Sequence, residues 1–324
     1  MKRSLRFALF LAVVLAVRMG VAQDELFKAR TFVAPDTFTS GAEGPACAVD
    51  GALYAVGYGE MTDGSSASGT LGIMLAMFTS YNGDFSIGRV TAGGESSAFV
   101  DMPEGSSGNG IRFNREGDML VADYAGHNVL KVDMETRVVS VFAHESSMNQ
   151  PNDLAIGADG RIYASDPNWR ESTGQIWRID TDGVVTRLEA DMGTTNGIEV
   201  SADEKTLYVN ESVQRKVWAY DLSGGGEVSN KRLLLEFEDG GMDGMRCDVD
   251  GNLYIARYGK GAVVQVSAAG EVLREIELSG ENPTNIAFGG ADGRTCYVTV
   301  KDKGNIEMFR VDRPGRSWAL NRGR

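Results

Sequence analysis

The sequence predicts an all-β chain, a six-bladed β-propeller with four-stranded blades around a central channel. Three observations favour this fold class. One short phrase recurs six times, the copies start 66, 43, 44, 47 and 42 residues apart, and each copy alternates like a β-hairpin around an Asp-Gly or similar turn. Repeats of about 40 to 50 residues that are built from short strands are typical of β-propellers.

Six hairpins are therefore expected in chain order, each with an apolar run, a turn and a second β-rich run. The copies read EGPACAVDGALYAV from Glu43, NGIRFNREGDMLVA from Asn109, NDLAIGADGRIYAS from Asn152, NGIEVSADEKTLYVN from Asn196, DGMRCDVDGNLYIA from Asp243 and NIAFGGADGRTCYVT from Asn285. In a propeller the first strand of each blade lines the channel. The six opening side chains all carry an oxygen and would converge on one axis, which predicts a site for a hard cation.

The segments outside the repeats are assigned from their composition. Residues 1–22 combine a basic start with an apolar run too short to span a bilayer, which is typical of a secretory signal peptide. Arg18 beside that run leaves an uncleaved anchor as an alternative. We expect a lead-in over 23–40, one propeller domain over 41–318 and a polar tail over 319–324. The expected location is secreted or periplasmic, with no stable membrane association after cleavage.

The first blade is expected to carry an insertion over residues 61–82. Without this segment, the first spacing would match the other four. The insertion follows a second strand, so it would leave the propeller at the face where the first strands begin. Two interpretations stay open: residues 71–78 form an apolar lid over the channel mouth, or the segment is a disordered insertion without a role.

The bulk composition excludes some partners. The formal net charge is −13 and no basic cluster is present, which argues against nucleic acid as a partner. Three cysteines, Cys47, Cys247 and Cys296, are an odd number for an exported chain, and we expect them to be buried free thiols. A monomer or a small homo-oligomer is expected.

The floor of the predicted channel combines two kinds of oxygen ligand. Glu43 and Asp243 supply carboxylates, whereas the other four opening residues supply amides. Two facing carboxylates in a narrow channel repel each other unless a divalent cation lies between them. The preferred ion is Ca²⁺, because the floor offers oxygen ligands and no His or Cys. Zn²⁺, Mg²⁺ and Mn²⁺ are the alternatives. For Asn109 and Asn285, a role as plain turn residues stays open.

A second set of candidates lies after the second strand of each hairpin, where the chain returns to the mouth of the channel. A polar and aromatic rim around a polar floor suits a small polar ligand. For His127, a solvated turn residue is the alternative to a substrate contact. The candidate substrate-binding residues are Asn109, Tyr124, His127, Asp166, Trp169 and Arg257.

Several phrases together resemble the senescence marker protein (regucalcin)/gluconolactonase family of six-bladed propellers, whose superfamily also holds diisopropyl fluorophosphatase and the paraoxonases. The resemblance runs from about Ala42 to Trp318. It is carried by EGP at Glu43, the N-x-P-N-D form at Asn149, YASDPNW at Tyr163, TNGIEVSADEKTLYV around Asn196, GGMDGMRCDVDGNLYIA around Asp243 and PTNIAFGGADGRTCYVT near the end.

The resemblance implies a divalent cation held by Glu43, Asn196 and Asp243, with Asn152 as a further ligand or a substrate contact. Asp243 and Asn152 are the implied catalytic residues, with Asp243 as the candidate general base. The implied activity is metal-dependent hydrolysis of small lactones, which makes a small lactone the expected partner. A phosphotriesterase on the same site and a non-catalytic binding propeller are the alternatives.

Two departures from the family pattern limit what the resemblance implies. Gln150 stands where the animal lactonases have Arg, which puts their mode of sugar-lactone recognition in doubt here. The His dyad of the paraoxonases has no counterpart, since His127 and His144 are the only histidines.

Overall fold

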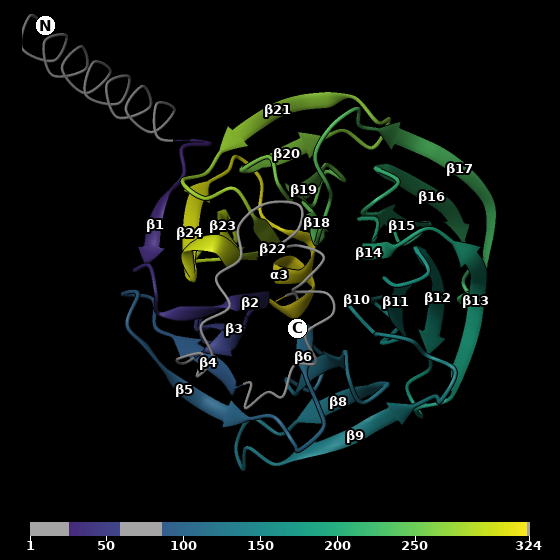
Figure 1. Cartoon of the computed structure of the whole chain (residues 1–324), viewed down its shortest axis with the longest axis horizontal. Helices are drawn as coiled ribbons and strands as arrows, with labels where there is room; N and C mark the ends of the chain where they lie inside the picture. Colours follow the sequence, from purple (N-terminus) through teal and green to yellow (C-terminus); the bar gives the residue numbers. More distant parts are fainter. Residues whose placement is uncertain (1–25, 59–85, 323–324) are drawn as a thin grey trace, which may run out of the picture.

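A computed structural model describes residues 26–58 and 86–322. The chain is a six-bladed β-propeller made of six four-stranded antiparallel sheets arranged in a ring (Figure 1). The predicted fold class is confirmed. The expected signal peptide over 1–22 and the insertion over 61–82 both lie outside the described residues.

The first three blades follow one another along the chain, and in each the strands are hydrogen-bonded in sequence order. Their strands are β2 (Phe38–Cys47), β3 (Leu53–Tyr58), β4 (Ser86–Val90) and β5 (Ser96–Asp101) in the first blade, β6 (Gly108–Phe113), β7 (Met119–Asp123), β8 (Asn128–Val132) and β9 (Val139–His144) in the second, and β10 (Leu154–Ile156), β11 (Ile162–Asn168), β12 (Thr173–Ile179) and β13 (Val185–Met192) in the third.

The fourth and fifth blades repeat this order, whereas the sixth takes its outer strand from the start of the chain. The strands are β14 (Thr195–Val200), β15 (Thr206–Glu211), β16 (Lys216–Leu222) and β17 (Val228–Glu236), then β18 (Met245–Cys247), β19 (Leu253–Arg257), β20 (Ala262–Val266) and β21 (Val272–Glu277), and finally β22 (Pro283–Gly289), β23 (Thr295–Val300), β24 (Asn305–Arg310) and β1 (Arg30–Val33).

Strand β1 closes the ring. It pairs antiparallel with β24, with Arg30 opposite Met308 and Thr31 opposite Glu307, so hydrogen bonds join the two ends of the domain (Figure 1). The sequence analysis placed residues 23–40 before the propeller. That boundary is corrected by the structure, because β1 within this segment completes the sixth sheet.

The hydrophobic core consists of six clusters, each between two neighbouring blades. Between the first and second blades, for example, Tyr54, Ile87 and Phe99 pack with Ile111 and Val121. The apolar positions of the hairpins thus face the adjacent sheets, as expected for sheets that stack around an axis. The polar opening residues are left to face the channel.

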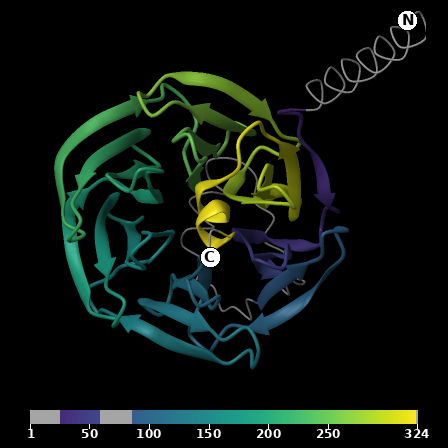
Figure 2. The ribbon, with the colours of Figure 1, turned by 180° about the vertical axis from the view of Figure 1, so that it is seen from behind.

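One short helix covers the end of the channel opposite the hairpin starts. Helix α3 (Arg316–Arg322) lies near the centre of the ring in both views (Figures 1 and 2). Trp318 Nε1 donates to Gly290 O at 3.1 Å, and Arg322 Nη2 donates to Val49 O at 2.8 Å. The expected polar tail over 319–324 therefore begins inside a helix that contacts the sixth and first blades.

The three cysteines form no disulfide. Cys247 and Cys296 are buried, as expected, whereas Cys47 is half-buried. Burial raises the pKa of all three thiols, which favours the inert neutral form. Within residues 26–58 and 86–322, no helix is long and apolar enough to cross a membrane.

Candidate metal centre

The six floor residues enter the channel at or near the start of the first strands. Asn109 and Asn196 are the second residues of β6 and β14, and Asn152 and Asp243 come just before β10 and β18. The strand register shifts beside Glu43, Asn109, Asn196 and Asn285. Such bulges re-aim side chains that would otherwise follow the regular pleat.

The glycine after a floor residue allows the next blade to approach closely. A Cβ atom on Gly44, whose φ is +53°, would lie 1.9 Å from the carbonyl oxygen of Asn109 in the next blade. A Cβ atom on Gly244 would lie 2.0 Å from the side chain of Asn285. These Glu-Gly and Asp-Gly pairs therefore serve the close packing of inner strands around a narrow channel.

Glu43 and Asp243 form an acidic pair at this floor. Asp243 is 8% exposed and Glu43 is half-buried. Burial raises the pKa of Glu43 to about 8. Burial also raises the pKa of Asp243 well above its usual range, and the nearby charge of Glu43 raises it further. Each group thus disfavours the ionised form of the other. A bound divalent cation would instead favour the ionised form of both.

The amides at the floor supply neutral oxygens. The Oδ1 atoms of Asn109, Asn152 and Asn196 are buried and accept no hydrogen bond from the described part of the chain. The Asn196 side chain also hydrogen-bonds the Asp243 carboxyl group and lowers its pKa. Asn285 differs, because its Oδ1 accepts a hydrogen bond from Ile286 N at 2.9 Å. A buried oxygen without a partner costs about 1–3 kcal/mol, so these three oxygens favour a ligand.

This donor set fits a hard divalent cation. Two carboxylates and neutral amide oxygens are the ligands that Ca²⁺ takes in proteins. Among the described residues no group of three or more His, Cys, Asp or Glu side chains could hold a metal ion. Glu43, Asn152, Asn196 and Asp243 are the residues that could hold the ion.

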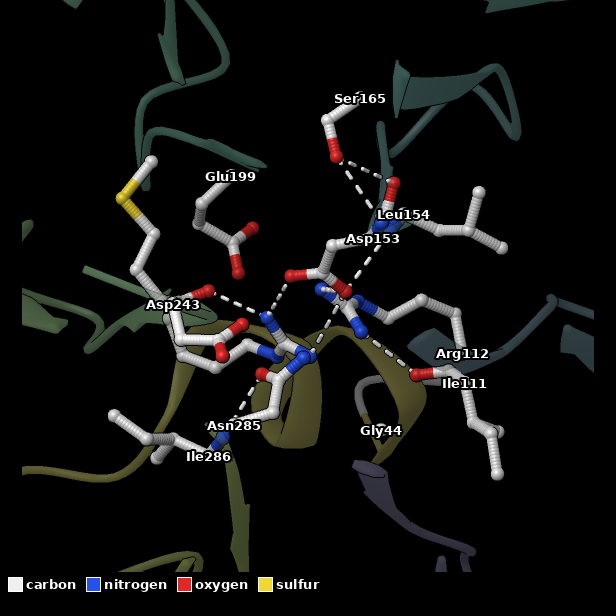
Figure 3. Close-up of polar contacts among 12 residues, drawn as sticks. Gly44, Ile111, Arg112, Asp153, Leu154, Ser165, Glu199, Asp243, Asn285 and Ile286 are labelled. Carbon is white, nitrogen blue, oxygen red and sulfur yellow. Dashed lines mark hydrogen bonds and ion pairs between the residues drawn. The ribbon is translucent and has the colours of Figure 1, made fainter. Parts of the chain in front are cut away.

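A layer of buried charges lies next to the floor residues Asp243 and Asn285, and sequence reasoning missed it (Figure 3). Asp153 is fully buried and accepts hydrogen bonds from Arg246 at 2.9 and 3.4 Å. Arg112 Nη2 lies 3.2 Å from Asp153 Oδ1. Asp153 thus ties the second and fifth blades to the third, beside the candidate ligands Asn152 and Asp243.

The layer continues to helix α3. Arg316, which is 4% exposed, lies 3.3 Å from Glu199 Oε1 through Nη1 and donates to Glu204 Oε1 through Nε at 3.0 Å. Arg112, Glu199 and Arg246 each stand three residues after a floor residue. A charged residue thus occupies the same position in three of the six copies. This pattern in the sequence could have revealed the layer.

Three predicted rim residues lie where the sequence placed them, at turns that follow second strands. Tyr124 follows β7 and is half-buried. His127 adopts φ of +61°, and its Nδ1 lies 2.7 Å from Met148 O. Trp169 follows β11 and is half-buried, with its backbone N–H bonded to Gln150 Oε1 at 3.4 Å. Contact of these side chains with a ligand stays a prediction.

Asp166 is buried rather than presented at the rim. Its carboxylate is fully buried and accepts hydrogen bonds from the backbone of Asn149 and Gln150 and from the side chains of Gln175 and Trp177. The turn before β10 therefore wraps around the carboxylate, and contact of Asp166 with a substrate stays a prediction. In this arrangement, Asp166 holds that turn beside Asn152.

Arg257 is likewise engaged with protein groups. It is 2% exposed and donates to the Asp239 carboxylate at 3.1 Å and to Gly241 O at 3.3 Å. Its guanidinium lies 3.6 Å from the centroid of the Phe237 ring. Arg257 thus shapes the segment that leads to Asp243, and its contact with a substrate stays a prediction.

Two further residues act on the acidic pair. Asn210, which is fully buried, donates from Nδ2 to the backbone oxygen of Asp243 at 2.7 Å and so positions this residue. The charge of Lys301, in the 3-10 helix η1 (Lys301–Lys303), lowers the pKa of both Glu43 and Asp243. Lys301 thus favours the ionised form of both carboxyl groups.

The fold and the floor define a class of protein: a six-bladed propeller whose channel ends in two carboxylates and buried amide oxygens. Residues 83–302 match the family described as SMP-30/Gluconolactonase/LRE-like region. The chain belongs to this family, which confirms the resemblance read from the sequence.

Two relatives and one solved structure illustrate the kinship. Pentonolactonase XacC of Haloferax volcanii is 31% identical over 194 residues, which cover 59% of this chain and 66% of that protein, just under two thirds of its length. Diisopropyl-fluorophosphatase of Loligo vulgaris is 24% identical over 302 residues, covering 85% of this chain and 90% of that protein. The structure of a calcium-binding protein, regucalcin, from Agrobacterium tumefaciens has a TM-score of 0.71 at 21% identity and covers 89% of this chain and 95% of that one.

Proposed function

We propose that the protein is a divalent-cation-dependent hydrolase of small lactones. The proposal rests on the meeting of Glu43 and Asp243 with the amide oxygens of Asn152 and Asn196 at one channel floor. These oxygens find no hydrogen-bond donor among residues 26–58 and 86–322. A non-catalytic scaffold has no need for two carboxylates that disfavour each other's charge. The pentonolactonase relative supports lactones as the substrate class.

The residues of the floor would divide the work between holding the ion and moving a proton. When bound, the cation would supply Lewis-acid polarisation of the lactone carbonyl and a lower pKa for water. Asp243 would accept the proton of the attacking water, and Asn152 and Asn196 would orient the carbonyl or the water. Tyr124, His127 and Trp169 would contact the rest of the substrate, since they follow the second strands at the mouth.

The ion we propose is Ca²⁺, because hard oxygen ligands without a His or Cys are what this floor offers. Support comes from the regucalcin structure, which is that of a calcium-binding protein. Zn²⁺, Mg²⁺ and Mn²⁺ are the alternatives. We also propose export to the periplasm or the outside, from the composition of residues 1–22, and a monomer or small homo-oligomer.

Chelation is the direct test of the proposed function. Activity on a panel of small lactones, including glucono-δ-lactone, is expected to disappear with a chelator and to return when Ca²⁺ is restored. Parallel additions of Mg²⁺, Mn²⁺ and Zn²⁺ identify the ion that supports turnover. Bound metal without activity on any lactone would move the proposal to phosphotriesters, which the fluorophosphatase relative suggests. Neither activity nor bound metal would indicate a binding propeller.

The acidic pair also predicts how stability depends on pH. The metal-free folded chain keeps a proton on Glu43 up to a pKa of about 8, whereas the unfolded chain releases it near pH 4.5. Because the folded state binds more protons over this interval, its free energy of unfolding should fall as pH rises, by at most about 1.4 kcal/mol per pH unit for one group.

Urea unfolding of the chelated chain between pH 5 and 8 measures this slope. Ca²⁺ binds the ionised pair, so the stabilisation that it adds should grow over the same interval. Glu43→Gln removes the titrating group and is expected to flatten the slope of the chelated chain. The raised pKa of Glu43 would be contradicted if the chelated wild-type chain were as stable at pH 8 as at pH 5. In that case its free energy of unfolding would change with pH no more steeply than that of Glu43→Gln.

A further inference from the structure

A cavity of about 100 Å³ lies at the far end of the channel, between the buried charged layer and helix α3. None of the six floor residues lines it, so it is separate from the candidate metal centre. Ile111, Phe113, Phe288 and Trp318 form an apolar part of its wall. Exposed Arg115 and Leu320, the latter 38% exposed, stand at its outer side and give it access to solvent.

The charged part of the wall is dominated by cations. Arg112, Arg246 and Arg316, which are 6%, 2% and 4% exposed, line the cavity together with exposed Arg115. Glu199 is the one carboxylate among the described lining residues. Asp153 and Glu204, which pair with these arginines, stand behind the wall. Among the groups that a ligand would meet, arginines therefore outnumber carboxylates four to one.

Among the three buried arginines, Arg112 is the one whose donors are least used. Arg316 is engaged through all three guanidinium nitrogens, and Arg246 donates twice to Asp153. Arg112 makes one side-chain hydrogen bond to the described residues, from Nη1 to Ile111 O at 2.7 Å. Its buried Nη2 lies 3.2 Å from Asp153 Oδ1, an ion-pair contact whose geometry falls short of a well-aligned hydrogen bond.

This situation is unfavourable for a buried cation. An arginine carries five N–H donors, and each buried donor without an acceptor costs about 1–3 kcal/mol, or more when the group is charged. Burial and the charge of Arg246 together lower the pKa of Arg112 to about 10, against the opposing charges of Asp153 and Glu199. An acceptor that also carries negative charge would relieve both effects.

We propose that this cavity binds a small organic carboxylate, with its charged end at Arg112 and its short hydrocarbon end against Phe113 and Trp318. A carboxylate matches the fork of a guanidinium, to which it can bind through two oxygens. A water molecule needs only about 10–15 Å³ of such volume, so the cavity holds a larger guest. The apolar wall favours a carboxylate with a short chain over chloride or phosphate.

Calorimetric titration at constant ionic strength tests the proposal on the whole chain in the presence of Ca²⁺. Propionate is expected to bind, and chloride and phosphate are expected to bind at least tenfold more weakly. Arg112→Gln should lower propionate affinity about tenfold or more, as for a lost charged hydrogen bond. Arg294→Gln is the matched control, because it removes an exposed arginine from the same face and should leave the affinity unchanged.

Two more variants separate this site from the metal centre and from a folding defect. Leu320→Trp should narrow the entrance and weaken propionate binding while all charges are kept, so it serves if Arg112→Gln does not fold. Asp243→Asn alters the metal centre and should leave propionate binding intact. The proposal is overturned by equal binding of propionate and chloride, by unchanged affinity in Leu320→Trp and any folded Arg112→Gln, or by loss of binding in Asp243→Asn.

Discussion

Asp243→Asn should bind the divalent cation poorly and lose about 10³-fold or more in kcat/KM on any lactone that the wild-type chain hydrolyses. The substitution keeps the shape of the side chain but removes one of two carboxylates at the floor and the proposed proton acceptor. Glu43→Gln should likewise lose metal affinity, because one carboxylate would remain to balance the ion. Metal content after dialysis and initial rates measure the two effects.

Asp50→Asn is the matched control for this pair. Asp50 belongs to the hairpin turn of the first blade, and its side chain is 55% exposed at the far face. Its substitution should leave metal content and rate unchanged. Full turnover in both Asp243→Asn and Glu43→Gln, with the fold intact, would rule out the metal mechanism.

The second large effect concerns stability. Asp153→Asn should lower the free energy of unfolding by about 3–5 kcal/mol, because it leaves Arg112 and Arg246 buried without their shared carboxylate. Removing one partner of a buried ion pair costs more than the pair itself contributes, since the remaining charge stays out of water. Urea unfolding measures the loss. Saturating Ca²⁺ is present throughout, so that a change in metal affinity contributes little to the difference in the free energy of unfolding.

A surface ion pair provides the comparison. Asp221 pairs with Arg232, and each side chain is 50% exposed. Asp221→Asn should change the free energy of unfolding by less than about 1 kcal/mol, as is usual for exposed pairs. If Asp153→Asn costs no more than Asp221→Asn, the buried layer does not hold the blades together as described.

Much of the architecture was predictable because it is encoded locally. Each hairpin has its own alternating pattern and turn, and the period of the copies follows from the length of one blade. The floor residues were found for the same reason, since they open each copy. The reason for the glycines beside them was missed. At Gly44 a side chain is excluded by the backbone of Asn109, which belongs to another blade.

The rim was predicted less well. The turn after a second strand was correctly placed at the mouth, but position along the chain does not tell whether a polar side chain points outward. Asp166 turns inward to the donors of Gln175, Trp177 and the preceding loop. Arg257 stacks on Phe237. Such choices depend on partners elsewhere: another strand of the same blade for Asp166, and the end of the preceding blade for Arg257.

By itself, the sequence determined the number of blades, the hairpins and the six oxygen-bearing residues at the floor. Closure of the ring by β1, the burial of Asp166 and the pairing of Asp153 with Arg246, 93 residues away, were decided by the tertiary structure alone. The physical reason is that a repeat pattern reports on short-range hydrogen bonding and burial. Contacts across the channel exist only once six separate blades have been brought around one axis.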